Sequence, residues 1–191
     1  MNLSELQKFD FTHPGHWIVG ADRDWAGETS QVLGLMEYEF VLAATSYAMF
    51  EPVTQGTMED HRSSSVYERC LNSIYATSFV FSLDSITKLL EVLNRLNPPE
   101  PVPTLISEYR VQFGDLRYVR DSVAHNEDRG RGLDKDRKAL STPLIILRCF
   151  NQTRFECTGS DGACHGIDIS ESALLDAHRI LQDILNAYSW E

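Results

Sequence analysis

The placement of proline restricts the fold of this chain more than any other feature of its sequence. The seven prolines stand at positions 14, 52, 98, 99, 101, 103 and 143, and the long stretches between them contain none. Proline breaks a helix interior because it has no N–H to donate and its ring clashes with the preceding turn. The spacing therefore leaves room for long helices between the prolines.

Apolar residues recur at helical spacing in three stretches before Pro143, which predicts helices within residues 26–142. The first stretch covers about residues 26–50. The second runs to Pro98 and starts at Ser65, which forms a capping box with Glu68. The third begins with Thr104 as its cap and continues to the glycines near residue 130.

After Pro143 the pattern changes from helical to β. LIILRCF and RFEC are rich in β-formers, NQT and GSDG are turn signals, and HGIDI is a candidate third strand. This predicts a small antiparallel β-hairpin at 143–169, followed by a helix over 170–191 that Ser170 or Asp168 caps. The expected architecture is a single domain over 1–191, mainly α, with a four-helix up-and-down bundle and the hairpin inserted before the C-terminal helix.

Charge and composition narrow the class of function. The chain has 191 residues and a net charge of −11, which disfavours a broad surface for nucleic acid or membrane. Its N-terminal sequence lacks the basic start and apolar run of a secretion signal. Four scattered cysteines are too few for a disulfide scaffold. We therefore expect a soluble, cytoplasmic protein with no membrane association.

The stretch RYVRDSVAHNEDRGRG concentrates charge near the end of the third predicted helix. Arg117, Asp121 and His125 are spaced four residues apart, so we expect a ladder in which the carboxylate contacts both neighbours and raises the pKa of the histidine. Arg120 falls at the edge of the apolar stripe instead. A charge there is costly unless it is paired, bent out to solvent or used.

A second apolar side of this helix suggests a partner. Val111 and Tyr118 lie on the same side as His125 and away from the core stripe. A second copy of the chain packing there would bury them, and it would bring two sets of Arg and His together in one cleft. The sequence therefore predicts a homodimer.

The motif Arg120-Asp-Ser-Val-Ala-His125 resembles the R-x4-6-H motif of the HEPN superfamily, which also has an all-helical bundle fold. The resemblance implies that Arg120 and His125 are a catalytic pair, shared between two protomers of a metal-independent endoribonuclease. The position after the arginine is commonly Asn in the family and is Asp121 here, where a carboxylate can orient His125. Arg117, Asn126 and Arg129 would then contact the RNA backbone, and no cofactor or metal is implied. By analogy, such a protein is a toxin or a phage-defence effector.

The residue types fit this chemistry. RNA carries its own nucleophile, the 2′-OH, so the protein has only to move a proton and stabilise the phosphate. Histidine exchanges protons near neutral pH, and the arginine fork matches phosphate oxygens.

Two other interpretations stay open. The charges could be solvated, with His125 complementing the dipole at a helix end. Some HEPN domains are non-catalytic, so a helical dimer that binds a protein partner, such as an antitoxin-like protein, is the alternative function. A zinc site at Cys149, Cys157, Cys164 and His165 is disfavoured, because the gap between Cys157 and Cys164 is wider than structural zinc sites use.

Overall fold

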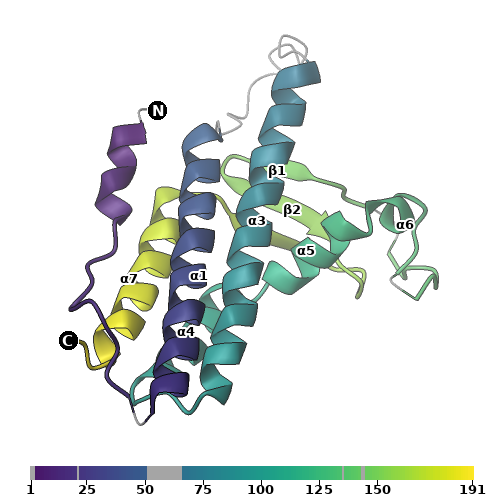
Figure 1. Ribbon diagram of the computed structural model, residues 1–191. Coiled ribbons are helices and arrows are strands. Elements are labelled where there is room, and N and C mark those ends of the chain that lie inside the picture. Colours follow the sequence, from purple (N-terminus) through teal and green to yellow (C-terminus); the bar gives the residue numbers. More distant parts are fainter. Residues whose placement is uncertain (1–2, 21, 51–65, 135, 143–144) are drawn as a thin grey trace.

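The structure is a computed structural model that describes residues 3–20, 22–50, 66–134, 136–142 and 145–191 (Figure 1). In these ranges the helices are Leu3–Phe9 (η1, a 3-10 helix), Arg23–Met49 (α1), Val66–Arg95 (α3), Val102–Gln112 (α4), Leu116–Ala124 (α5), Asn126–Gly130 (α6) and Glu171–Ala187 (α7). The strands are Cys149–Asn151 (β1), Arg154–Thr158 (β2) and Cys164–Asp168 (β3). The prediction of a mainly helical protein with a small antiparallel sheet before the last helix is confirmed.

The two long helices α1 and α3 pack side by side and form the front of the molecule in Figure 1. α1 begins slightly before the predicted start because Asp22 caps it, accepting a hydrogen bond from the backbone N of Trp25 at 2.7 Å. In the last turn of α1, the hydroxyl of Ser46 lies 2.8 Å from the hydroxyl of Ser78 on α3. The predicted capping box at Ser65 lies outside the described residues.

The core is a single apolar cluster between α1 and α3 on one side and α4, α5, α7 and the sheet on the other. Large fully buried apolar side chains come from α1, α3, α4, β2 and α7, and α5 adds the smaller Val119: Phe40, Phe79, Leu83, Ile86, Tyr109, Phe155, Leu174 and Val119. Burial of this kind of surface is the main driving force for folding.

The predicted third helix is three helices, which corrects the sequence-based expectation. α4 ends at Gln112, the chain turns through Gly114 and Asp115, and α5 starts at Leu116. Thr104 does not cap α4, because the N-cap residue is Pro101. The chain turns again between α5 and α6, and Gly130 ends α6 as predicted.

The break between α4 and α5 has a tertiary cause. The carboxylate of Asp115 accepts a hydrogen bond from the backbone N of Gly166 at 3.2 Å and lies 3.0 Å from Nδ1 of His165. Both partners belong to β3, so the start of α5 is fixed to the sheet and not to the preceding helix. Helical periodicity reports local spacing and carries no signal for such a contact.

The sheet is a meander in the order β1-β2-β3, with both pairs antiparallel. The HGIDI segment forms most of the third strand, as the sequence suggested, so the insert is a three-stranded sheet and not a two-stranded hairpin. Its turns fall where the sequence placed them, at Gln152 (φ 57°) and Gly162 (φ 80°). β2 and β3 pack against α5, so the sheet supports the helix that carries Arg120.

The last helix starts as predicted. Ser170 is the N-cap of α7, and its hydroxyl accepts a hydrogen bond from the backbone N of Ala173 at 3.2 Å. Just beyond α7, Trp190 pairs with Ile18 in an isolated antiparallel bridge. Across the described ranges, we find no helix with both the length and the apolarity needed to span a bilayer.

Candidate functional site

Arg120 lies on α5 and is held by two carboxylates. Its Nε is 3.2 Å from Oδ2 of Asp84 on α3, and its Nη1 is 2.7 Å from Oδ1 of Asp121. The Asp84 contact is an ion pair without hydrogen-bond geometry, since Nε has no hydrogen-bond partner. Lys88 also contacts Asp84, at 2.6 Å.

These contacts show that Arg120 is not a freely solvated charge. The side chain of Asp84 is only 8% exposed, and a carboxylate buried to that degree needs a cation beside it. Arg120 supplies one at the interface of α3 and α5, while 27% of its own side chain stays exposed. The guanidinium is therefore fixed in position and still reachable from solvent.

The expected ladder from Arg117 through Asp121 to His125 does not form in the described structure. Asp121 pairs with its sequence neighbour Arg120, and Arg117 is exposed. His125 does lie directly after α5, where its backbone N donates to the carbonyl of Asp121 at 3.0 Å. Arg120 and His125 thus share one short segment, with Asp121 between them in both sequence and contacts.

The region after His125 differs more from the sequence-based expectation. Asn126 opens α6 and is partly exposed, so it stays accessible to a ligand. Arg129 is 0% exposed, and its Nη1 donates to the carbonyl of Leu133. A fully buried guanidinium cannot contact an RNA backbone in this conformation, so the predicted role of Arg129 is corrected.

A group of metal-ligand type surrounds His125. Ligand atoms of His125, Glu127 and Asp128 all lie within 4.8 Å of one another. One imidazole and two carboxylates are a donor set that transition metals accept. Sequence spacing did not single out this group, which the turn between α5 and α6 brings together.

A second polar cluster joins the start of α5 to the sheet. His165 lies between two carboxylates, with Nδ1 at 3.0 Å from Asp115 and Nε2 at 2.9 Å from Asp161. The ring of Tyr118 stacks on it at 4.0 Å with an interplanar angle of 6°. His165 was considered for zinc with the cysteines, but its partners are aspartates.

The pKa values in this cluster reflect mutual charge stabilisation. Burial by itself lowers the pKa of His165, but the hydrogen bonds and charges of Asp115 and Asp161 outweigh it and raise the pKa above 6.5. Burial likewise raises the pKa of Asp115, but the contacts with His165, Gly166 and Arg154 lower it below 3.8. Protonated His165 therefore links α5, β3 and the β2–β3 turn.

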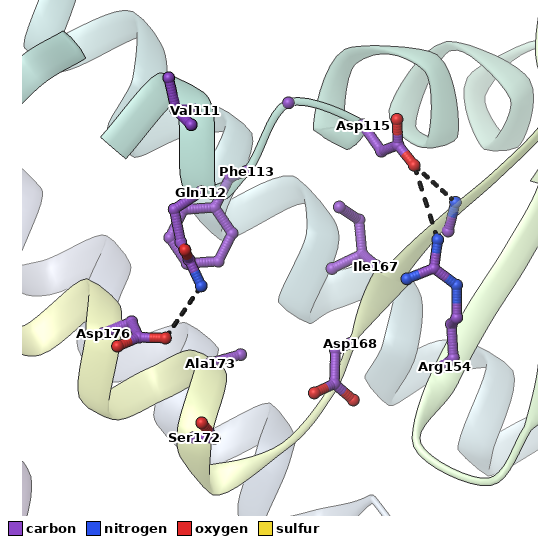
Figure 2. A pocket seen from close by; sticks show the side chains of 12 residues that line it. Val111, Gln112, Phe113, Asp115, Arg154, Ile167, Asp168, Ser172, Ala173 and Asp176 are labelled. Carbon is purple, nitrogen blue, oxygen red and sulfur yellow. Dashed lines mark hydrogen bonds and ion pairs between the residues drawn. The ribbon is translucent and has the colours of Figure 1, made fainter. Parts of the chain in front are cut away.

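A cavity of about 350 Å³ opens beside this cluster, between the end of α4, the sheet and the start of α7 (Figure 2). Three aspartates and one arginine line it, and each carboxylate has partners. Asp176 accepts from Gln112 at 2.8 Å, Asp115 lies 3.6 Å from Arg154, and Asp168 accepts from two hydroxyls. The acidic lining disfavours a phosphate, so this cavity is not the expected RNA site.

Comparisons with models of known protein families, with curated proteins and with solved structures found no match.

Proposed function

We propose that this protein is a metal-independent endoribonuclease of the HEPN type, with Arg120 and His125 of two copies acting at a shared site. The observation that supports this most is the placement of Arg120. Buried Asp84 holds the guanidinium at the surface of α5, one short turn away from the end of the helix where His125 lies. Cytoplasmic RNA would be the substrate class, and a toxin or defence role follows by analogy with the family.

The reaction that these two side chains can support is transfer of the phosphate to the neighbouring 2′-oxygen. His125 of one copy accepts the proton of the 2′-OH while the oxygen attacks phosphorus. The bond from phosphorus to the 5′-oxygen breaks, and His125 of the other copy protonates that leaving oxygen. Arg120 stabilises the extra negative charge on the phosphate in the transition state. The products are a 2′,3′-cyclic phosphate and a 5′-hydroxyl.

The test is cleavage of end-labelled RNA by the purified full chain in the presence of EDTA. His125→Asn should lower the rate by about 100-fold or more, which is the usual contribution of a general acid or base. Arg120→Lys should also be impaired, since lysine keeps the charge beside Asp84 but loses the planar fork. His16→Asn and Arg23→Lys are matched controls, because both residues are exposed in the N-terminal part of the chain.

The chemistry gives further checks. A DNA oligonucleotide of the same sequence lacks the 2′-OH and should stay intact. Cleavage of DNA, loss of activity in EDTA, or full activity of His125→Asn would each contradict the proposal.

A second candidate is a non-catalytic helical dimer that binds another protein, such as an antitoxin-like partner. The observation that favours it is that Asp84 and Asp121 together bind Arg120, so two carboxylates compete with any phosphate. The net charge of −11 points the same way. If the intact dimer cleaves no RNA and His125→Asn changes nothing, this candidate replaces the first.

A further inference from the structure

The outer side of α1 and α3 carries large apolar side chains that nothing in the described structure covers. They are Leu35, Tyr38 and Leu42 on α1 and Leu71, Ile74 and Phe81 on α3, and we call this set the α1/α3 face. Their exposed fractions run from 36% for Leu42 to 61% for Tyr38. Figure 1 shows α1 and α3 side by side, and the core lies between this pair and α4, α5, α7 and the sheet.

The residues of the face follow one stripe on each helix. On α3 they recur at intervals of three and seven residues, and on α1 at three and four, as expected for one side of a helix. The contact between Ser46 and Ser78 fixes the two helices next to each other, and they run in opposite directions (Figure 1). Leu42, one turn before Ser46, and Ile74, one turn before Ser78, therefore lie on opposite sides of this contact. The two stripes follow one another along the helix pair.

This surface has few charged side chains in a protein that is rich in them. The chain is 24% charged, yet α3 has no charged residue from Cys70 to Leu83. On α1, the charged residues between Gln31 and Met49 are Glu37 and Glu39, and both are only partly exposed. Depletion of charged residues together with aromatic and aliphatic enrichment is typical of the centre of a protein–protein interface.

Two glycines on α1 add an independent observation. Gly27 and Gly34 lie on the exposed side of α1, seven residues apart, and a Cβ at either position would meet nothing within 4 Å. Glycine weakens a helix interior, and packing among the described residues gives no reason for it at these positions. A neighbouring backbone that approaches closely from outside would give one.

The exposed area is what a stable dimer requires. Large apolar side chains have about 200 Å² of surface each. With Met49 and Tyr67 at one end, the exposed fractions of the face amount to on the order of 800 Å², which each partner buries in an interface of standard size. Larger exposed apolar patches than this are rare in monomers.

We propose that the α1/α3 face is the homodimer interface, where a second copy packs its own α1 and α3 to complete a four-helix arrangement. A two-fold axis makes such an interface self-complementary, and the two helices are similar in length, 27 and 30 residues. Two chains of net charge −11 repel each other least where each presents few charges. The lack of basic side chains on this face disfavours nucleic acid there.

This assignment differs from the one that the sequence suggested. Val111 is 84% exposed on α4, but Tyr118 is covered on one side by the ring of His165 from the same chain. The Val111–Tyr118 side thus has far less apolar surface to offer a partner. The proposed function also needs two copies of the chain, but neither Arg120 nor His125 belongs to this face, so the interface and the shared site are separate claims. The test of the interface uses no RNA, and the two claims can fail separately.

Sedimentation equilibrium and light scattering on the purified full chain test the interface. The wild type should have twice the chain mass at micromolar concentration. Leu42→Glu and Ile74→Glu each place a charge on both sides of the interface and should raise the dimer dissociation constant by on the order of 100-fold or more. Circular dichroism should be unchanged, because both side chains are exposed in the single chain.

Three further variants make the result decisive. Val111→Glu and Leu175→Glu place the same charge on exposed apolar positions outside the face and should remain dimeric. Gly34→Leu should raise the helix content or leave it unchanged and still weaken the dimer. A monomeric wild type overturns the proposal, and so does a dimer that Val111→Glu dissociates while Leu42→Glu does not. A dimer that depends on Leu42 but cleaves no RNA supports the interface and removes only the proposed function.

Discussion

The ion pair between Asp84 and Arg120 allows a quantitative test that does not depend on catalysis. Asp84→Asn and Arg120→Met keep much of each side chain's volume and remove its charge. Two unit charges 3 to 4 Å apart near a protein surface attract by about 4 kcal/mol before desolvation. Arg120 is 27% exposed and Lys88 also contacts Asp84, so both solvent and a second cation reduce the net value. We expect a coupling free energy of about 1 to 2 kcal/mol between the two positions.

The assay is a double-mutant cycle by urea unfolding, followed by circular dichroism at a fixed protein concentration. Arg120→Met alone should destabilise the protein more than Asp84→Asn alone, since it leaves a buried carboxylate with Lys88 as its only cation. The double variant should recover part of that loss. A coupling below about 0.3 kcal/mol would mean that the two charges act independently. The argument that Asp84 positions Arg120 would then be wrong.

Three other predictions follow from contacts described above. The pKa of His165 is raised above 6.5, so its ion pairs should stabilise the fold at pH 6.5 and be lost as pH rises through the raised value. Urea unfolding should therefore show that the stability advantage of wild type over His165→Gln shrinks between pH 6 and 9. The same advantage should fall in acid, as pH drops through the lowered pKa values of Asp115 and Asp161, and an advantage independent of pH would contradict the assignment. Ser170→Ala removes the cap of α7 and should lower the unfolding free energy by about 1 kcal/mol, whereas Ser172→Ala, two residues later and inside the helix, should change it little. Arg129→Met removes a buried guanidinium whose Nε and Nη2 have no hydrogen-bond partner among the described residues. The variant should therefore have a melting temperature equal to or above that of the wild type. A large drop in melting temperature would contradict this and show that the guanidinium has a stabilising partner.

The sequence predicted the helices and turns whose causes are local. Proline and glycine positions, the Ser170 cap and the change of period after Pro143 depend on neighbours within a few residues, and the structure confirms the elements they predict. The prediction failed where a residue far along the chain determines where a helix ends. Asp115 ends one helix and starts another because its partners are on β3, 50 residues further along the chain.

In the candidate site, too, the sequence predicted positions along the chain but not contacts between distant residues. Sequence spacing placed Arg120 at the edge of the core and required a partner for it, but it could not name Asp84 on another helix. It assigned Asp121 to Arg117 and His125, whereas the folded chain pairs it with Arg120. The sequence analysis also treated Arg129 as a surface cation, because helical spacing of apolar residues does not indicate that an arginine is buried. The pair GD at 114–115 inside an apolar pattern was the one available signal for the helix break.

The shortness of α5 has a consequence for how the chain matures on the ribosome. A helix of nine residues is only marginally stable by itself, since isolated helices need about 12 to 15 residues. Its N-cap residue, Asp115, is anchored by a strand that is synthesised much later, so α5 has no fixed position while the chain is still growing. Arg120 and His125 therefore reach their final arrangement only after β3 has left the ribosome, and a ribosome stalled before that point carries a nascent chain without a formed site.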